Sequence, residues 1–261
     1  MKTYPEDKLK ILLWDIETAC PVVYSWGLGQ QYINFGQVIH EGYILCISWK
    51  WLGEKKIHSV QLTPAECKAR NDKRILKEFS QVLNKADYYV GHNVKDFDLK
   101  MINTGLITHK LPPVAPSQIL DTLKLSRQNF KFLSNKMDAI CQKLELGRKA
   151  ETGGFALWKA CMSGCPKAMK KMVKYNKQDI VINENLFERI LPFINLPTRL
   201  NTSVILDTDK LSGILARYRC PTCNSKGMDI NKKYVTKAGN LRLACRCKAC
   251  YACTTIAGGK A

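Results

Sequence analysis

The sequence lacks long apolar runs and is poor in acidic residues. None of its apolar stretches approaches the roughly 18 residues that a membrane span needs, so no membrane partner is expected. The first residues, MKTYPEDKLK, carry charges of both signs, which is not the pattern of a secretory signal. No internal repeat or low-complexity segment is found. The protein is therefore expected to be cytoplasmic, in a reducing compartment, and not secreted.

The shortage of acidic residues makes the chain strongly basic. It has 41 Lys and Arg against 22 Asp and Glu, a formal net charge of +19 over 261 residues. Residues 199–261 hold 12 basic and 3 acidic residues and are the most densely basic part. Such an excess favours nucleic acid as the partner. An anionic membrane surface, or charge that only keeps the protein soluble, would give the same composition.

Apolar, β-rich segments come early in the chain, and helical patterns come later. Strands are predicted over 9–15, 43–52, 57–62, 87–91 and around 118–122. Helices are predicted over 72–86, from about 96, over 134–146, over 153–164 and over 166–191. This mixture indicates an α/β domain. We expect it to occupy residues 1–198, followed by a connector over 199–216 and a small cysteine-rich domain over 217–261.

Segment 18–42 fits neither the strand period nor the helix period. It is rich in aromatic and amide residues and has little charge, so we expect an ordered excursion beside the first strand. Its aromatic side chains could stack on bases, although filling a surface groove is the more ordinary use. Phe155 and Trp158, at helical spacing further along, are expected in the core.

The first strand ends on two carboxylates, Asp15 and Glu17, that stand one residue apart. Residues i and i+2 of a strand point to the same face, and carboxylates so close repel each other unless a cation lies between them. A second acidic group follows the β-like run YYVG, where Asp98 stands at a helix start. A third, Asp179, lies four residues after Tyr175 on one face of the long late helix.

Four such carboxylates have the composition of a two-cation site. Hard ions such as Mg²⁺ and Mn²⁺ prefer oxygen ligands. Two of these ions can clamp the attacking and leaving oxygens of a displacement at phosphorus. For the D-x-E pair alone, a strand that simply runs into a polar turn would be the alternative.

The segments DIET, GHNVKDFD and YNKQD match, in order and spacing, the three motifs of DEDD-type (DnaQ-like) 3′–5′ exonucleases of the tyrosine subclass. The second motif resembles most the proofreading exonuclease domains of family B DNA polymerases. Residues 8–195 are also similar to stand-alone exonucleases of phage genomes. The resemblance implies an α/β fold with a ribonuclease-H-like mixed sheet flanked by helices.

The resemblance also implies a role for each motif residue. The ligands of two Mg²⁺ or Mn²⁺ ions would be Asp15, Glu17, Asp98 and Asp179. Tyr175 would orient the attacking water, because a phenol with a pKa near 10 is a poor base at neutral pH. Asn93 would contact the terminal nucleotide. His92 is a further candidate substrate contact, although a histidine in a turn is more often only hydrogen-bonded.

Two neighbouring carboxylates are expected to be structural. Asp96 is expected to cap the helix that starts near it, so Asp98, which follows Phe97, is preferred as the metal ligand. Asp121 ends another short strand and resembles a recurring family position, but we expect it to support the fold.

Six of the 12 cysteines lie within residues 220–253. Two C-x2-C pairs can form a tetrahedral structural zinc site. The first pair is Cys220 with Cys223, and the second is either Cys247 with Cys250 or Cys250 with Cys253. We choose Cys247 and Cys250, because LRLACR is typical of a strand that leads into such a pair, and two cysteines are then left over. A disulfide cluster is the alternative.

The cysteine-rich segment resembles a zinc ribbon, in which one structural Zn²⁺ would stabilise a fold too small to bury its own core. Its basic residues are expected to clamp nucleic acid; a protein-docking ribbon is the alternative. The whole sequence predicts a metal-dependent 3′–5′ exonuclease that releases 5′-mononucleotides from DNA, with single-stranded DNA favoured over RNA. An RNA-directed 3′–5′ exonuclease and a non-catalytic nucleic-acid-binding or polymerase-docking protein are the alternatives. A DNA polymerase or another replication protein is a further expected partner.

Overall fold

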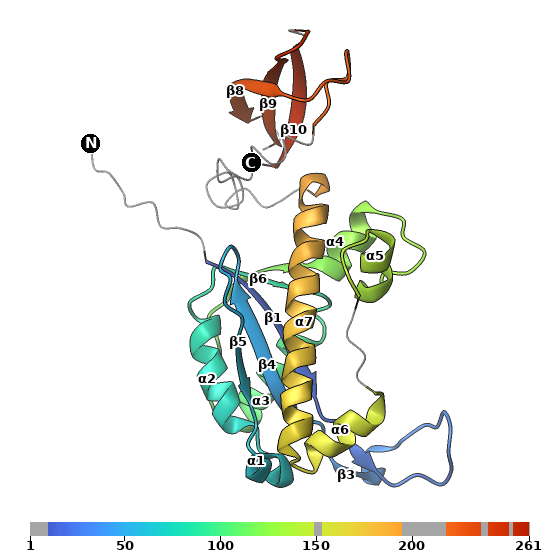
Figure 1. Cartoon of the computed structure of the whole chain (residues 1–261). Helices are drawn as coiled ribbons and strands as arrows, with labels where there is room; N and C mark the ends of the chain where they lie inside the picture. Colours follow the sequence, from blue (N-terminus) through green and yellow to red (C-terminus); the bar gives the residue numbers. More distant parts are fainter. Residues whose placement is uncertain (1–9, 149–152, 195–217, 236–239, 251–252, 261) are drawn as a thin grey trace, which may run out of the picture. The chain divides into compact units, whose positions relative to one another are not determined.

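A computed structural model describes residues 10–148, 153–194, 218–235, 240–250 and 253–260 (Figure 1). The chain folds into two compact units, Lys10–Phe187 and a second one that contains Glu188–Ala261. The expected connector over 199–216 lies outside the described residues, so the two expected domain boundaries stay predictions. Among the described helices, none has both the length and the apolar character that crossing a membrane requires.

A five-stranded sheet in the order β5-β4-β1-β6-β7 forms the centre of the larger unit. The central strand β1 (Ile11–Thr18) pairs antiparallel with β4 (Ile44–Trp51), and β4 pairs antiparallel with β5 (His58–Gln61). On its other side β1 pairs parallel with β6 (Tyr88–Gly91), which pairs parallel with β7 (Gln118–Asp121). The predicted mixed sheet is therefore confirmed.

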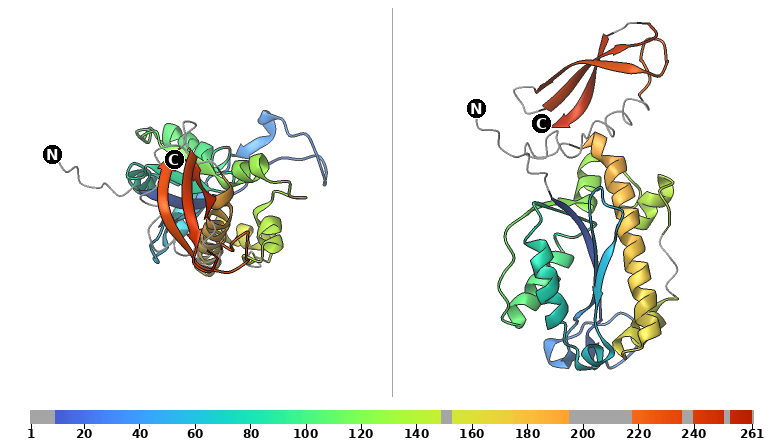
Figure 2. Two further views of the ribbon diagram at one scale, coloured as in Figure 1. Left: turned by 90° about the horizontal axis from the view of Figure 1, so that it is seen from above. Right: turned by 60° about the vertical axis from the view of Figure 1, so that its left-hand side comes forward.

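Helices cover both faces of this sheet (Figure 2, right). On one face lie α2 (Lys73–Leu83) and α3 (Asp98–Thr108). On the other lie α6 (Phe155–Met162) and α7 (Pro166–Ile190), and α7 continues into the 3-10 turn η2 (Leu191–Phe193). The predicted flanking helices are thus present.

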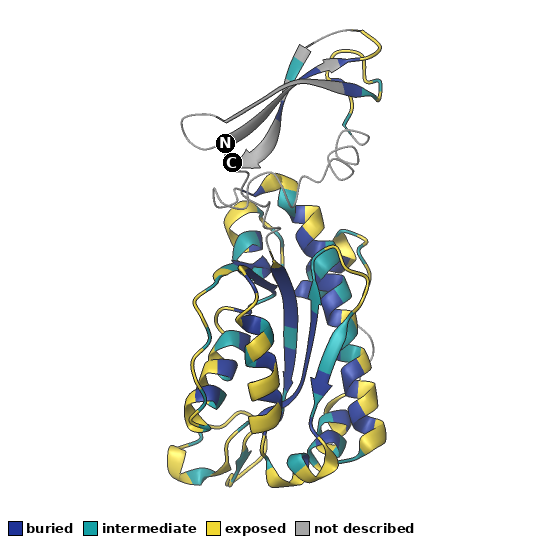
Figure 3. Cartoon of the chain, turned by 90° about the vertical axis from the view of Figure 1, so that its left-hand side faces the viewer, coloured by how far each residue is buried: buried dark blue, intermediate teal, exposed yellow. Residues whose placement is uncertain are grey.

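The helix faces that meet the sheet are apolar, as their sequence periods predict. The buried residues of α2 recur at helical spacing: Ile75, Leu76, Phe79 and Leu83. The ring of Phe79 lies 5.3 Å from that of Trp14 on the central strand. Figure 3 shows the strands buried and the outer helix faces exposed. Each such buried side chain contributes roughly 1.5–3 kcal/mol, so this core fixes the strand ends on which the polar motif residues stand.

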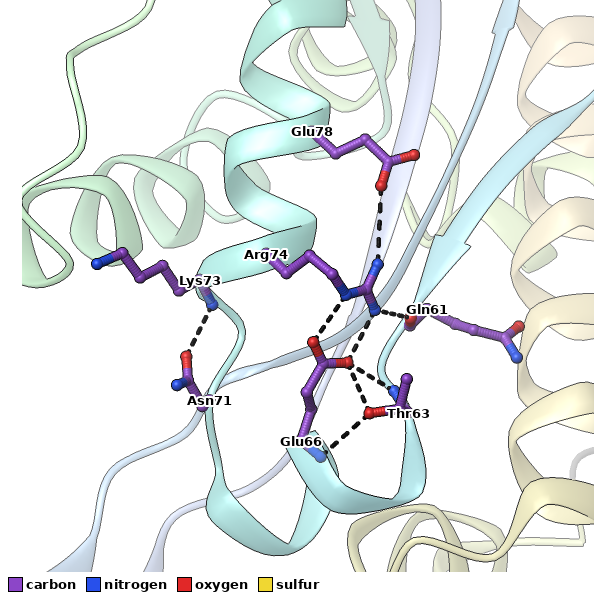
Figure 4. Close-up of polar contacts among 7 residues, drawn as sticks. All are labelled: Gln61, Thr63, Glu66, Asn71, Lys73, Arg74 and Glu78. Carbon is purple, nitrogen blue, oxygen red and sulfur yellow. Dashed lines mark hydrogen bonds and ion pairs between the residues drawn. The ribbon is translucent and has the colours of Figure 1, made fainter.

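Two short helices were not expected from the sequence, α1 (Pro64–Ala69) and α4 (Thr122–Asn129), and α5 (Met137–Lys143) is shorter than expected. The start of α1 is a capping box: Thr63 Oγ1 accepts the N–H of Glu66, and the Glu66 carboxylate accepts the N–H of Thr63 at 2.8 Å (Figure 4).

The capping carboxylate of Glu66 also binds Arg74 of α2 through Nε at 2.7 Å and Nη2 at 2.8 Å (Figure 4). These hydrogen bonds, above all those from Arg74, lower the pKa of Glu66 to about 2. One carboxylate therefore joins the start of α1 to α2.

The chain between β1 and β4 forms a protruding arm (Figure 1). In this aromatic arm, residues 22–40, β2 (Val22–Val23) pairs antiparallel with β3 (Val38–His40), which follows the 3-10 turn η1 (Phe35–Gln37). Its large apolar side chains are exposed: Tyr24, Trp26, Leu28, Tyr32 and Phe35. The expectation that the aromatics fill a groove is wrong, and so is the expectation that Phe155 lies in the core, because its side chain is 62% exposed.

The smaller unit contains a three-stranded antiparallel sheet in the order β10-β9-β8. Its strands are β8 (Met228–Val235), β9 (Asn240–Cys247) and β10 (Cys253–Lys260). Before β8, an isolated bridge between Arg219 and Lys226 closes the turn that carries the first cysteine pair.

Candidate active site

Three carboxylates from distant parts of the sequence meet at the end of β1. Oxygen atoms of Asp15, Glu17 and Asp179 all lie within 4.8 Å of one another. Asp15 and Glu17 share one face of β1, and Asp179 reaches them from α7. Glu17 and Asp179 are buried, whereas Asp15 is partly exposed. The structure thus brings the first and third motifs together.

Asp98 lies beside this group but is not one of the three clustered carboxylates. Its buried side chain accepts, through Oδ1, the backbone N–H of Ile16 at 3.2 Å. Ile16 stands between Asp15 and Glu17, so the second motif contacts the same strand end. Asp98 is also the first residue of α3, where the helix dipole favours a negative charge.

Asp96 does not cap α3, contrary to the expectation from the sequence. The helix begins at Asp98, and its N-cap residue is Phe97, without a side-chain capping bond. Asp96 is exposed and forms ion pairs with Lys124 at 2.8 Å and Lys100 at 3.6 Å. The hydrogen bond from Lys124 lowers the pKa of Asp96. Asp98 is therefore buried, whereas its close sequence neighbour Asp96 is exposed.

Asp121 supports the loop that carries the second motif. Its carboxylate accepts the backbone N–H groups of Asn93 at 2.9 Å, Lys95 at 3.1 Å and Leu123 at 3.0 Å. Asn93 has a φ of 67°, in the left-handed region that asparagine tolerates better than most residues. Asp121 thus fixes the turn between β6 and α3, which is a structural role.

His92 is held by the protein through both ring nitrogens. Nδ1 lies 3.0 Å from Thr122 Oγ1, and Nε2 lies 3.0 Å from the carbonyl oxygen of Asn135. A carbonyl oxygen only accepts, so Nε2 carries a proton. Thr122 Oγ1 also lies 2.9 Å from Asn183 Oδ1 of α7, and its one hydroxyl proton serves either this oxygen or Nδ1. With both nitrogens engaged, the face of the imidazole ring is what His92 can offer to a ligand.

Tyr175 lies one helical turn before Asp179 and is partly exposed. Its ring meets that of Trp158 edge to face, with 6.3 Å between centroids and an angle of 70°. Trp158 lines a cavity of about 400 Å³ together with Thr18, Cys20, Gly154 and Phe155. Thr18 directly follows Glu17 along β1, and Trp158 contacts Tyr175, so the cavity lies at the same end of β1 as the carboxylates. A larger cavity of about 540 Å³ lies along α3 and residues 111–117 and has no carboxylate in its lining.

Asn176 belongs to the site, although the sequence analysis missed it. Its side chain is fully buried, and Nδ2 donates to Asp15 Oδ2 at 2.6 Å. Its Oδ1 has no hydrogen-bond partner among the described residues. The bond from Nδ2 fixes the Asp15 carboxylate relative to α7. The sequence signal was an amide three residues before Asp179, on the same helix face.

The field around the carboxylates is negative. Cys46 of β4 pairs with Glu17 across the sheet, and burial, followed by the charges of Glu17 and Asp15, raises the pKa of its thiol well above the usual value. A site with only oxygen donors and like charges within 4.8 Å fits hard divalent cations such as Mg²⁺ and Mn²⁺.

Four thiols converge in the smaller unit. The sulfur atoms of one set all lie within 4.8 Å of one another: Cys220, Cys223, Cys247 and Cys250. The Sγ–Sγ distance is 3.6 Å between Cys220 and Cys250 and 3.7 Å between Cys223 and Cys247. Tetrahedral zinc with Zn–S bonds of about 2.3 Å requires sulfur separations of about 3.8 Å. The sulfur set therefore fits Zn²⁺, and Cys245 is buried outside it.

Ser225 prepares this sulfur set for a cation. Its Oγ lies 2.9 Å from Cys223 Sγ and 3.3 Å from Cys247 Sγ. Hydrogen bonds from Ser225 and from the backbone N–H of Cys250 lower the pKa of Cys247 to about 6, and Ser225 also lowers the pKa of Cys223. Zinc binds thiolates rather than thiols, so the local hydrogen bonds favour the form that binds metal.

Comparison with known proteins shows what the chain is similar to. The family model of the RNase H superfamily matches residues 39–191, more than half of the chain. A DNA polymerase III of the PolC type from Ureaplasma parvum serovar 3 (strain ATCC 700970) is 25% identical over 167 residues, which are 56% of this chain and 11% of that protein. The structure of the family B DNA polymerase from the archaeon Pyrobaculum calidifontis matches with a TM-score of 0.51 and 15% identity, over 74% of this chain and 26% of that one. The chain thus spans only a minor part of either polymerase, and the second likeness concerns the fold alone.

Proposed function

The chain belongs to the RNase H superfamily, and from this premise we propose that it is a divalent-metal-dependent 3′–5′ exonuclease that shortens DNA, with single strands preferred. The family and the PolC-type relative support a nuclease role. The observation that carries the proposal is the meeting of Asp15, Glu17 and Asp179 within 4.8 Å at the end of β1. In this proposal the chain is of the DEDD type, tyrosine subclass.

Two Mg²⁺ or Mn²⁺ ions would be held by these three carboxylates together with Asp98, which lies beside them. When bound, such ions lower the pKa of water and stabilise the charge that develops on the phosphate. Asn176 holds Asp15 in a fixed orientation through the 2.6 Å bond to Oδ2.

Tyr175 would hold the attacking water by a hydrogen bond. A phenol is a poor general base at neutral pH, so in this proposal Tyr175 orients the water without deprotonating it. The oxygen of the water forms a bond to the terminal phosphorus, and the bond from phosphorus to the 3′-oxygen of the preceding nucleotide breaks. A 5′-mononucleotide leaves, and the shortened strand ends in a 3′-hydroxyl group.

The terminal nucleoside would lie in the cavity of about 400 Å³ beside Tyr175, against Trp158 and Phe155. Asn93 would contact its sugar or base from the loop that Asp121 fixes, and His92 would offer its ring face. Both are partly exposed.

The smaller unit is proposed to be a zinc ribbon with one structural Zn²⁺ on Cys220, Cys223, Cys247 and Cys250. Four sulfur ligands complete a tetrahedral site and leave no position for water, which makes the role structural. Its basic residues, 12 in residues 199–261, would bind the phosphates of the strand. Association with a DNA polymerase or another replication protein is proposed as well, because the two relatives are polymerases.

The test uses 5′-labelled single-stranded DNA and the matching RNA with Mg²⁺. Wild type is compared with Asp179→Asn and with the matched control Asp96→Asn, which changes an exposed carboxylate outside the cluster. We expect a ladder that shortens from the 3′ end, faster on DNA, absent with Asp179→Asn and retained with Asp96→Asn. Tight binding without a ladder would overturn the enzyme proposal and leave a nucleic-acid-binding protein. Cleavage of a circular single strand would show an endonuclease instead.

A further inference from the structure

The aromatic arm is held together by polar side chains and presents its apolar ones to solvent. Gln37 donates through Nε2 to the carbonyl oxygen of Tyr24 at 3.0 Å and accepts through Oε1 the N–H of Asn34 at 2.9 Å. Ser25 Oγ lies 2.7 Å from the carbonyl oxygen of Gly27 and 2.9 Å from Gln31 Oε1 (one hydroxyl proton serves one of them at a time). This is the reverse of the larger unit's core, where apolar side chains are inside.

Five large apolar side chains in the middle of the arm are between 72% and 102% exposed: Tyr24, Trp26, Leu28, Tyr32 and Phe35. None of the ring contacts found among the described residues joins two of these aromatics. They therefore stand apart from one another, with glycine and amide residues between them. Exposed apolar groups gathered in one segment mark an interaction site, and separated rings leave space for flat groups to stack between them.

The arm begins next to the candidate active site. Its first strand starts four residues after Thr18, and Thr18 and Cys20 line the cavity that Trp158 and the exposed Phe155 close from α6. Figure 1 shows the arm extending beyond α6 at that end of the larger unit. A chain-like ligand that ends at the carboxylates can therefore continue along the arm.

The distribution of charged residues indicates which part of such a ligand the arm can contact. Residues 19–40 contain no Lys, Arg, Asp or Glu, so the arm offers nothing that pairs with phosphate. Exposed lysines lie instead on α7, the helix that carries Tyr175 and Asp179: Lys167, Lys170, Lys171 and Lys174. Phosphates suit α7, whereas bases suit the arm.

We propose that the aromatic arm is a stacking platform for unpaired bases of the strand whose 3′ end enters the carboxylate site. The proposal rests on the proposed function, because it names the substrate class of that same site: single-stranded nucleic acid. In a duplex the ring faces of the bases are covered by their neighbours, so only a single strand presents them to Trp26 and Tyr32. The arm thereby selects single strands without reading their sequence.

The test measures binding of a 20-nucleotide oligo-dT strand and of a duplex of equal length at 50 and 300 mM KCl. All proteins carry Asp179→Asn so that the strand stays intact. Chelators are avoided because they would remove the Zn²⁺ that we propose to be bound by the four cysteines. Trp26→Ala with Tyr32→Ala is compared with Trp26→Phe with Tyr32→Phe. Ile107→Ala removes a matched exposed apolar group from α3, and Lys171→Gln with Lys174→Gln removes charge from α7.

We expect the double alanine variant to bind the single strand about 10- to 100-fold more weakly, because each base–aromatic stack carries a large part of such affinity. The factor should be equal at both salt concentrations, since no phosphate contact is lost. The phenylalanine pair should restore binding, and Ile107→Ala should change nothing. The lysine variant should weaken binding mainly at 50 mM.

Single-strand binding unchanged by the alanine pair would overturn the proposal and leave the arm to a protein partner. An equal loss on the duplex would overturn it too, because stacking on unpaired bases cannot explain it. If wild type shortens strands from the 3′ end and the arm variants bind normally, the arm proposal alone fails. If wild type shows no ladder, the proposed function fails, and the binding result stands separately.

Discussion

The carboxylate cluster and the cysteine cluster both fit metal ions, yet the residues of the first are far apart in the sequence and those of the second are close together. Asp15 and Asp179 are 164 positions apart in the sequence and meet because a five-stranded sheet and the long helix α7 place them. The four cysteines lie within 31 residues and join a turn to the end of one strand. The first site is held in place by its fold, whereas we propose that metal binding at the second holds its own fold together.

This difference follows from how each cluster affects the stability of the protein when no metal is bound. Carboxylates within 4.8 Å repel one another, so the core of the larger unit must hold them against that repulsion. Thiols can stay neutral and bring no such cost, but among the side chains described within residues 218–260, the buried apolar ones other than cysteines are Met228 and Ile256. A unit of that kind depends on a cross-link for its stability.

The largest expected effect comes from removing zinc. Cys220→Ser should unfold the smaller unit and leave the melting temperature of the larger unit unchanged, because structural zinc contributes roughly 10–16 kcal/mol in comparable small domains. Zinc stoichiometry and backbone amide NMR spectra would show this. Cys245→Ser, at a buried cysteine outside the set, should still bind one zinc. A smaller unit that keeps its fold without zinc would remove the contrast between the two sites.

Asp179→Asn should have the next largest effect. We expect hydrolysis to fall by about a thousandfold, equivalent to about 4 kcal/mol of transition-state stabilisation, with no loss of thermal stability in the metal-free protein, because a repelling charge is gone. The rise in melting temperature that Mg²⁺ or Mn²⁺ gives to wild type should disappear. Asp96→Asn should retain both the hydrolysis and the rise in melting temperature with Mg²⁺ or Mn²⁺. Loss of activity through unfolding would contradict this prediction.

Asn176→Leu tests how tightly the fold positions the first site. Without the bond to Asp15 Oδ2, the affinity for Mn²⁺ should fall by about 10- to 100-fold, as expected for partners that orient metal ligands. Thermal stability should change little, because an amide oxygen with no partner among the described residues leaves the core as well. Calorimetric titration of Mn²⁺ measures the first quantity, and Gln178→Leu, at an exposed position of the same helix, is the control.

Glu66 offers the smallest effect and a third case, a carboxylate that the fold pairs with its own cation, Arg74 (Figure 4). Its pKa is lowered from 4.5 to about 2 in the folded protein. Its contribution is therefore complete above pH 4.5 and is lost as the pH falls toward 2. After allowance for the exposed guanidinium, Glu66→Gln should cost about 1 kcal/mol, or 2–4 °C in melting temperature, at pH 7.

The pH profile separates this effect from a general loss of stability. The difference in melting temperature between wild type and Glu66→Gln should shrink from pH 5 toward pH 2. A difference that is constant over this range would show that the carboxylate charge is not the cause.

The sequence was most informative where a local pattern decides the outcome. The spacing of Asp15 and Glu17 on one strand, and of cysteines two apart, defines geometry within a few residues. The start of α1, a helix that the apolar periodicity does not predict, is equally local, since Thr63-Pro64-Ala65-Glu66 is a capping-box signature.

Tertiary contacts explain the remaining differences. Asn176 contacts a residue 161 positions away, so the sequence shows the amide but not its partner. Asp96 and Asp98 are both carboxylates near a helix start, and only the path of the chain into α3 buries one and exposes the other. The composition of segment 18–42 shows that aromatics are present but not whether they are exposed. Their exposure depends on how the segment folds back on itself, through contacts such as that of Gln37 Nε2 with the carbonyl oxygen of Tyr24.

The central claim is that the fold holds the carboxylate site while metal holds the cysteine site, and Mn²⁺ binding to zinc-free protein tests it most directly. Electron paramagnetic resonance would count bound Mn²⁺ before and after zinc removal. The account predicts two Mn²⁺ ions with the same affinity in both states, lost in Asp179→Asn. Loss of Mn²⁺ binding on zinc removal, or Mn²⁺ binding that Asp179→Asn leaves intact, would contradict it.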